Sequence, residues 1–340
     1  MADLSGEERI IRTLKREEVD RVPTFEWYID REVIEALSPG SNYEKFCYEL
    51  DLDAICIDVD FDKKILENGM IRDEWGMIKK DTGESHTYPV DGPVKTIRDA
   101  ENYQPPDPLK PGRYESIERA VKEHAGKKAL ILHLNDVLSI PSRLMPFEDF
   151  LIKVYEEPEL VKILISMSVD INLKMAKEAV KRGIKIVYTG DDFAYNSGPM
   201  MAPQVFRDIF YPELKRVVKG YKELGLLVIK HTDGNIYPIL DMIVDSGFDC
   251  LDPIDPIAGM DLQKVKTDYG DRITLKGNVD CSTTLSFKTE KETIEETKKC
   301  LEIAMPGGGY ILSSSNSIHS AVKPENYTAM LDTLKKFGKY

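Results

Sequence analysis

The stretch LVIKHTDGN, residues 227–235, indicates the fold more clearly than any other part of the chain. Its first half is a short, β-branched apolar run that is typical of a buried strand, and its second half changes abruptly to polar residues and glycine. Polar residues at the carboxyl end of a parallel strand are where α/β enzymes place their active sites. The same change recurs at 186–192, 273–281 and 310–319, so we expect several strand ends to contribute to one site.

Composition limits the class of protein. The chain has 46 basic and 59 acidic residues, a net charge of −13 at pH 7, which argues against a nucleic acid or a membrane surface as partner. No apolar run approaches the ~20 residues needed to span a bilayer, and the charged first twenty residues are not typical of a signal peptide. The five cysteines include no CxxC pair, which is typical of reduced thiols. We therefore expect a soluble cytoplasmic globular protein.

Strand-like and helix-like segments alternate along the chain. The predicted strands are 22–27, 53–59, 129–135, 186–192, 226–231, 250–254, 273–279 and 310–314. The predicted helices are 5–16, 114–124, 158–182, 203–224, 237–246, 261–269, 289–305 and 324–337. This alternation predicts an α/β fold, a (β/α)8 TIM barrel with an N-terminal helix, as a single domain over residues 1–340. An open doubly wound sheet is the alternative, although no GxGxxG follows the first strand.

One stretch, residues 68–93, breaks the alternation. Segments 73–77 and 85–89 flank the turn-like sequence Asp81-Thr82-Gly83. Two short strands around such a turn predict a β-hairpin inserted after the second strand of the barrel.

The strand ends supply candidate metal ligands. His231 ends a predicted strand two residues before Asp233, a placement that suits metal binding or acid–base chemistry. A core histidine that donates to a backbone carbonyl is the alternative. Cys281 follows another strand end and could join His231 as a thiolate, although a small buried hydrophobe would look the same. His231, Asp233 and Cys281 are thus the predicted metal ligands, and such a set favours zinc. By alternation, Lys230 and Lys276 are expected to point outward into the helix layer.

Several segments together resemble the uroporphyrinogen decarboxylase superfamily. They are Asp20–Pro23, Gly190–Asp192 with Gly198-Pro199 and Pro203, Tyr211–Lys215, His231–Gly234, Lys276–Asp280, Gly307–Tyr310 and Pro324–Asn326. The resemblance covers nearly the whole chain and is strongest from about residue 184 onward. It implies a (β/α)8 barrel, in agreement with the alternation of strands and helices.

The resemblance also implies one of two activities. The haem-pathway decarboxylases of the superfamily carry an arginine-rich segment after the first strand, whereas residues 24–30 here read TFEWYID. Porphyrinogen decarboxylation is therefore disfavoured. The other branch consists of methyltransferases that work with a corrinoid (cobalamin-binding) protein, and several of these bind zinc through a His-x-Cys motif and a later cysteine. Here Asp233 and Asn316 stand in the places of those cysteines, so the ligand set must differ.

The expected reaction is O-demethylation of a small methylated substrate, a methoxy-aromatic compound above all, by the Co(I) of a separate corrinoid protein. Zinc would activate the leaving oxygen; without it, His319 or Asp191 would have to donate a proton beside His231. The expected substrate-binding residues are Glu26, Trp27, Tyr28, Asp192, Asn278 and Asn316. Two alternatives stay open: a decarboxylase of a tetrapyrrole or another acid, and a non-catalytic binding barrel. The sequence does not fix the oligomeric state, and a homodimer is compatible with it.

Overall fold

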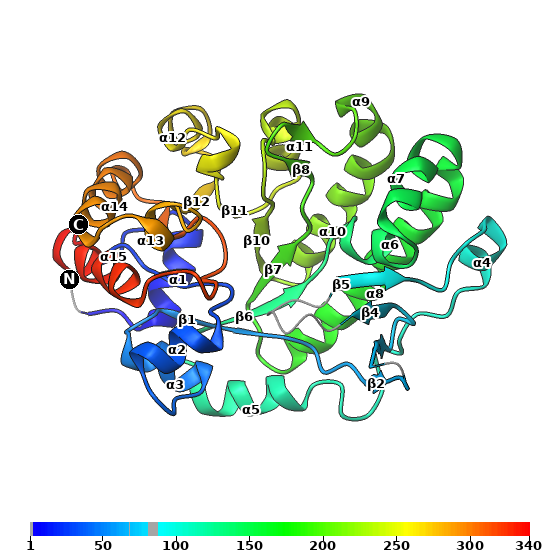
Figure 1. Ribbon diagram of the computed structural model, residues 1–340, viewed down its shortest axis with the longest axis horizontal. Helices are drawn as coiled ribbons and strands as arrows, with labels where there is room; N and C mark the ends of the chain where they lie inside the picture. Colours follow the sequence, from blue (N-terminus) through cyan, green and yellow to red (C-terminus); the bar gives the residue numbers. More distant parts are fainter. Residues whose placement is uncertain (1–2, 68, 81–87) are drawn as a thin grey trace.

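Seven parallel strands form the central sheet, in the order β1-β6-β7-β10-β11-β12-β13. The structure is a computed structural model, and it describes residues 3–67, 69–80 and 88–340. The sheet curves into a barrel with helices around its outside (Figure 1). Its strands are β1 (Ala54–Ile57), β6 (Ala129–Leu134), β7 (Ile186–Gly190), β10 (Leu227–His231), β11 (Cys250–Asp252), β12 (Thr274–Val279) and β13 (Tyr310–Ser314).

The barrel is closed by the predicted first strand, residues 22–27. Thr24 forms a parallel bridge with Leu312 of β13, and the N–H of Leu312 donates to the carbonyl of Pro23 at 3.0 Å. On the other side the N–H of Asp53 donates to the carbonyl of Thr24 at 2.7 Å. The segment forms one isolated bridge and no continuous ladder, because Pro23 lacks an N–H and the N–H of Thr24 donates to the Asp53 carboxylate instead. The predicted (β/α)8 barrel is confirmed.

The strands are buried on both faces, as expected for parallel strands between helices. Alternate side chains such as Ala54, Ile131 and Ile229 form a cluster inside the barrel, and the others pack against the helices. Helix α1 (Gly6–Leu14) contributes Ile10 and Leu14 to the interior cluster. Because α1 contacts β1, β6 and β13, it closes the barrel at the end opposite the polar strand ends.

The helices lie between successive strands in the chain. The longer ones are α2 (Arg31–Leu37), α3 (Tyr43–Glu49), α5 (Glu115–His124), α7 (Phe147–Glu156), α8 (Pro158–Lys181), α10 (Tyr211–Glu223), α12 (Leu262–Tyr269), α14 (Glu290–Ala304) and α15 (Pro324–Phe337). The shorter ones are α4 (Ile97–Asn102), α6 (Ser139–Arg143), α9 (Pro203–Val205), η1 (Phe206–Phe210), η2 (Tyr237–Ile239), α11 (Leu240–Asp245), η3 (Pro256–Ala258) and α13 (Thr284–Phe287). Across residues 3–67, 69–80 and 88–340, no helix has the length and apolar character needed to cross a membrane.

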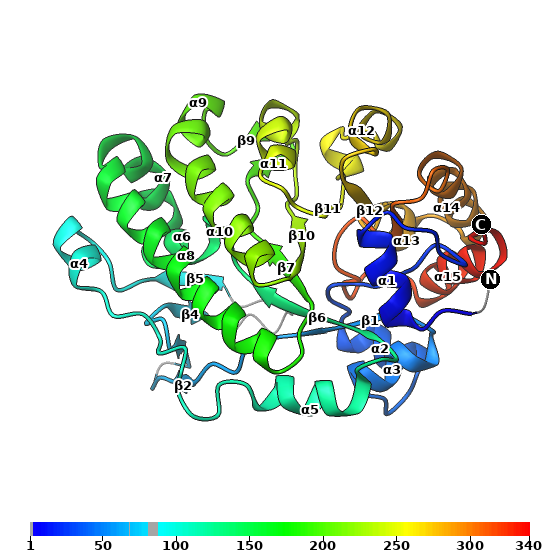
Figure 2. The same ribbon diagram turned by 180° about the vertical axis from the view of Figure 1, so that it is seen from behind.

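The insertion after the second barrel strand is larger than the predicted hairpin. It is a four-stranded antiparallel sheet at the end of the molecule away from α1 (Figure 2). Its strands are β2 (Lys63–Ile65), β3 (Ile71–Asp73), β4 (Ile78–Lys80) and β5 (Tyr88–Asp91). A two-stranded ribbon follows β7; its strands, β8 (Ala194–Tyr195) and β9 (Gly198–Pro199), have two residues each.

The predicted hairpin is present, as the antiparallel pair of β4 and β5, but its first arm lies at 78–80 and not at 73–77, because residues 74–77 form the turn between β3 and β4. Gly76 has a φ of 79°, a left-handed conformation that favours glycine, and its N–H donates to the carbonyl of Asp73. The predicted turn Asp81-Thr82-Gly83 lies outside the described residues.

Candidate active site

The polar strand ends line a cavity of about 520 Å³ at the carboxyl end of the barrel. Its walls come from the first strand segment, from β6, β7, β10, β11 and β12, from helix α6 (Ser139–Arg143), and from the loops after β1, β7, β10 and β13. The lining residues are Trp27, Tyr28, Asp58, His133, Arg143, Tyr188, Gly190, Asp192, His231, Asp233, Asp252, Lys276, Asn316 and Ser317.

His231 stands at the centre of this cavity. It is the last residue of β10 and has the same parity as the interior residue Ile229, so its ring points into the barrel. Its Nδ1 lies 2.9 Å from Asp252 Oδ2, and its Nε2 faces the carboxylates of Asp192 and Asp233. The imidazole is therefore held from behind by one carboxylate and presents its other nitrogen to two more.

Asp252 is the carboxylate that contacts Nδ1 of His231. Its Oδ1 lies 2.8 Å from the Lys276 ammonium, and its Oδ2 accepts a hydrogen bond of 2.5 Å from the Tyr188 hydroxyl. Asp252, Lys276 and Tyr188 are buried, whereas the His231 side chain is 13% exposed. Burial alone would raise the pKa of Asp252, but Lys276 and His231 outweigh it and hold the pKa at about 2. Asp252 is thus a permanent carboxylate that fixes the orientation of the imidazole.

Asp192, His231 and Asp233 form a group of potential metal ligands. One ligand atom from each lies within 4.8 Å of the other two. His231 Nε2 is 3.6 Å from Asp192 Oδ1 and 3.5 Å from Asp233 Oδ1, which is too long for a good hydrogen bond. A tetrahedral ion with bonds of about 2.1 Å separates its ligands by about 3.4 Å. The separations therefore fit a zinc-sized ion between the three residues.

Two further observations fit a cation at this group. Asp233 Oδ1 is buried and has no hydrogen-bond partner among the described residues, although a buried carboxylate oxygen normally has one. Burial, together with the nearby Asp192 and Asp255, raises the pKa of Asp233 to about 7 despite His231. Burial lowers the pKa of His231, but Asp233, Asp252 and Asp192 raise it to about 9. When no cation is bound, His231 and Asp233 bind protons instead.

Aromatic side chains form one wall of the cavity. Trp27 stacks on Tyr188 with ring centroids 4.6 Å apart and an interplanar angle of 2°. His133 meets the Trp27 ring edge-on at 4.4 Å, and Tyr188 in turn lies 5.7 Å from the His231 ring. Tyr188 is fully buried between Trp27 and His231, so the half-buried Trp27 ring is the part of this stack that lies open beside the potential ligands, and it suits a small substrate with an aromatic ring.

Comparison with known proteins agrees with this architecture. The family model described as uroporphyrinogen decarboxylase (URO-D) matches residues 71–337. The chain belongs to the uroporphyrinogen decarboxylase family.

Individual members of the uroporphyrinogen decarboxylase family are distant relatives. The chain is 22% identical over 188 residues to the uroporphyrinogen decarboxylase of Azoarcus sp., covering 53% of this chain and 49% of that protein. It is 21% identical over 264 residues to the one of Pseudoalteromonas atlantica, covering 72% and 70%. The first of these matches thus spans about half the length of the relative.

A solved structure within the same fold covers almost the whole chain. It is described as a methyltransferase from Methanosarcina mazei, with a TM-score of 0.79 and 20% sequence identity, and the match covers 98% of this chain and 99% of that one. At this identity the likeness shows the barrel fold.

In this uroporphyrinogen decarboxylase family member, six of the predicted site residues line one cavity. They are Trp27, Tyr28, Asp192, His231, Asp233 and Asn316. Asn316 lies close enough for its Nδ2 to donate to Asp233 Oδ2 at 2.5 Å, which links the loop after β13 to the potential ligands. Asp192, predicted to bind substrate, instead takes the position among the potential ligands that the sequence assigned to Cys281.

Cys281 is not placed with His231 and Asp233, so the predicted ligand set needs correction. Among the described residues, the group of converging ligand atoms at the cavity contains Asp192 and lacks Cys281. The thiol of Cys281 instead lies 3.5 Å from the Ser315 hydroxyl, and the cysteine N–H donates to the same oxygen. Burial raises the pKa of the thiol to about 11. It therefore behaves as a small buried side chain.

Four other predicted site residues lie outside the cavity lining. Asp191 is fully buried behind it, where Oδ2 accepts hydrogen bonds from the N–H groups of Asp136, Leu138 and Ser139. Lys230 and the backbone donors keep the pKa of Asp191 below its usual value although burial opposes them. These contacts make Asp191 a residue that holds the loop after β6, and a catalytic role for it remains a prediction.

Glu26, Asn278 and His319 likewise have other partners. Glu26 is buried, accepts hydrogen bonds from the N–H and the hydroxyl of Ser314, and has its pKa raised to about 7 by burial. Asn278 donates to the carbonyl of Ile254 at 2.9 Å. His319 Nδ1 accepts from the N–H of Ala321 at 3.3 Å in the loop after β13. None of the three is among the residues that line the cavity in the described part of the chain.

The sequence missed the buried network under His231. Lys276 points into the barrel and not outward as predicted, whereas Lys230 does point to the helix layer, where it lies 2.6 Å from Asp136. When a strand is apolar on both faces, its residues do not reveal which parity faces the interior. The register of the sheet supplies this information: Asp252 pairs with His231 across the two strands, so both point inward.

Proposed function

We propose that this protein is a methyltransferase that takes the methyl group of a small methylated compound, a methoxy-aromatic compound above all, and delivers it to the corrinoid of a separate protein. The reaction is an O-demethylation. Asp192, His231 and Asp233 would hold zinc. The observation that carries the proposal is the convergence of these three side chains beside the Trp27–Tyr188 stack, because it places a potential Lewis-acid site next to a surface for a flat substrate.

The comparisons support this proposal in a general way. The family includes enzymes described as decarboxylases, and the barrel matches one described as a methyltransferase over nearly its full length. The charges of the residues that line the cavity favour a methyltransferase over a decarboxylase. Four aspartates line it, against two permanent cations, Arg143 and Lys276, and Lys276 is already paired with Asp252. A substrate with many carboxylates would meet repulsion here.

The chemical difficulty of demethylation lies in the leaving oxygen. When the C–O bond breaks, the methyl carbon passes to the acceptor and the oxygen keeps both bonding electrons, so it must be protonated or bound to a Lewis acid. Zinc at this group would supply that stabilisation, on the order of several kcal/mol. Its donors, one imidazole and two carboxylates, belong to the types that zinc accepts.

The side chains of the chain itself position the reactants. Asp252 accepts from the Nδ1–H of His231, which leaves Nε2 free to face the cavity as a ligand. Trp27, supported by the buried Tyr188, would hold the ring of the substrate so that its ether oxygen lies toward Asp192 and Asp233. In the absence of a cation, the raised pKa of His231 keeps its Nε2 protonated at neutral pH, so the same nitrogen is able to donate a proton to the leaving oxygen.

Metal affinity at this group is expected to rise with pH. Zinc binds the neutral imidazole, but His231 has a pKa of about 9, so each pH unit below that value is expected to weaken binding about tenfold. Below about pH 7 Asp233 is also protonated, and the loss per pH unit becomes steeper. Calorimetric titration with zinc in buffers of different ionisation enthalpy would measure the protons released. An affinity that does not change between about pH 7 and 8 would contradict the assignment.

The direct test uses zinc-loaded protein with cob(I)alamin as the acceptor. Guaiacol, methylamine and dimethyl sulfide serve as methoxy-aromatic, amine and thioether donors, and the loss of the cob(I)alamin absorbance reports methyl transfer. We expect transfer from guaiacol and formation of catechol. A parallel incubation with uroporphyrinogen measures carbon dioxide release. Carbon dioxide release without any demethylated product would replace the proposal with the decarboxylase alternative, which the curated relatives favour.

A further inference from the structure

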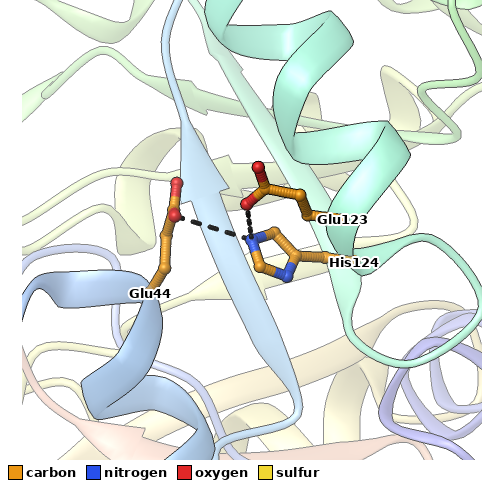
Figure 3. A group of neighbouring side chains, drawn as sticks. All are labelled: Glu44, Glu123 and His124. Carbon is orange, nitrogen blue, oxygen red and sulfur yellow. Dashed lines mark ion pairs between the residues drawn. The ribbon is translucent and has the colours of Figure 1, made fainter.

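A second group of potential metal ligands lies on the outside of the barrel, away from the cavity. Glu44 of α3 and Glu123 and His124 of α5 bring one ligand atom each to within 4.8 Å of one another. Figure 3 shows the two carboxylates facing the same nitrogen of the His124 ring. The two helices are separated in sequence by β1 and by the whole inserted sheet. The group therefore joins two distant parts of the chain.

His124 is the feature that distinguishes this group from an ordinary surface ion pair. The residue is 7% exposed, and its Nε2 is buried without a hydrogen-bond partner among the described residues. That nitrogen points at the two carboxylates, 3.6 Å from Glu44 Oε2 and 3.7 Å from Glu123 Oε2. A buried polar nitrogen normally has a partner, and both oxygens are too distant to be good ones.

The geometry matches that of the group at the cavity. A tetrahedral ion with bonds of about 2.1 Å has ligand-to-ligand separations of about 3.4 Å. The two separations around His124 Nε2 are only slightly longer than this value. An ion between the three atoms would give the orphaned nitrogen a partner with no rearrangement of the helices.

We propose that Glu44, Glu123 and His124 bind a divalent cation of the zinc type. The imidazole favours zinc over magnesium or calcium, which prefer oxygen ligands throughout. The other ring nitrogen already has support, because His124 Nδ1 lies 3.2 Å from the Tyr48 hydroxyl. With Nδ1–H donating to Tyr48, Nε2 is left as the ligand, which is the usual arrangement for metal-bound histidine.

Arg119 competes with the cation and so provides a sharp test. Its Nη1 donates to both oxygens of Glu44, at 2.9 and 3.0 Å, and lies 3.9 Å from Glu123 Oε2. A bound cation would share Glu44 with this guanidinium and would be repelled by it. Removing the charge of Arg119 should therefore tighten cation binding, whereas it would only weaken a group that is held together as a plain ion-pair network.

A cation bound at this site would link α3 to α5. A cation bound to the folded protein and not to the unfolded chain stabilises the folded state according to its concentration and affinity. This role is independent of the proposed reaction, since none of the three ligands lines the active-site cavity.

The experiment uses the full-length His231→Ala variant, in which the cavity group has lost its imidazole. Protein stripped with a chelator is titrated with zinc chloride, and bound zinc is counted by mass spectrometry after gel filtration. We expect one zinc per chain, a higher melting temperature with zinc, and neither effect when His124→Ala is added. Glu123→Gln should weaken binding on the order of tenfold or more, and Arg119→Gln should strengthen it. Glu115→Gln, an exposed position on the same helix, is the matched control and should change nothing.

Each other outcome counts against the site. Absence of bound zinc in His231→Ala would overturn the proposal, and so would zinc binding that survives both His124→Ala and Glu123→Gln, because it would then be adventitious. If His124→Ala fails to fold by circular dichroism, Glu123→Gln decides the question, since that side chain is half exposed and carries little of the packing.

Discussion

Replacing His231 with alanine is expected to remove the metal from the barrel cavity and to lower the rate of methyl transfer by about 10²–10⁴-fold. His231 supplies the only imidazole among the three converging side chains at the cavity in the described part of the chain. With the ring gone, Asp192 and Asp233 remain as two carboxylates near one another, and the leaving oxygen loses the Lewis acid, or the proton donor when no cation is bound. The loss should appear in kcat, because the interaction forms as the C–O bond breaks.

Metal counting makes this prediction specific. Zinc content should fall by one per chain in His231→Ala relative to wild type, while circular dichroism and the melting curve show a folded protein. His319→Gln tests the competing proton donor. Because Nδ1 of His319 already accepts from the Ala321 N–H, we expect the His319→Gln variant to retain most of the activity. Full methyl transfer in His231→Ala, or a larger loss in His319→Gln, would move the chemistry away from the Asp192, His231 and Asp233 group.

The barrel could be predicted because its signal is repeated. Seven of the eight predicted strands coincide with barrel strands to within about two residues at each end, and α8, α9 and α15 begin at Pro158, Pro203 and Pro324, as is common for proline in the first turn of a helix. The first segment, 22–27, closes the barrel through one isolated bridge, since proline removes one donor and a side chain takes the place of another. Short elements such as β2 and α6 could not be predicted, because three to five residues carry too little periodicity.

The site was predictable where a polar residue ends a strand or follows its end within two residues and the chain does not turn away from the mouth. His231 is the last residue of β10, and Asp233 and Asp192 lie two residues past the ends of β10 and β7, so strand direction places all three at the mouth. Cys281 is equally two residues past the end of β12, but there the Asp280 carboxylate accepts from the N–H groups of Ser282 and Thr283 and turns the chain. Such a turn decides where the thiol points, and its course depends on side-chain hydrogen bonds that spacing does not encode.

The buried ions below His231 explain why the largest effect on stability is expected at Asp252. Asp252→Ala leaves the Lys276 ammonium, the Tyr188 hydroxyl and His231 Nδ1 without their shared partner. Lys276 is then an unpaired charge in the barrel interior, where it is 2% exposed. Removing one member of a buried pair typically costs 3–5 kcal/mol, so we expect the free energy of unfolding, measured with urea, to fall by about that amount.

A double variant separates charge burial from support of the metal. Adding Lys276→Met to Asp252→Ala removes the orphaned ammonium and fills its space with an apolar side chain, so most of the lost stability should return. Zinc affinity at the cavity should not return, because His231 still lacks the acceptor that fixes its ring, and the loss of such a partner typically weakens binding 10–100-fold. If Asp252→Ala unfolds at the same urea concentration as the wild type, the ion pair between Asp252 and Lys276 contributes nothing to the free energy of unfolding. If zinc affinity recovers together with stability, Asp252 does not orient His231, and the ring must be held by its packing against Tyr188 alone.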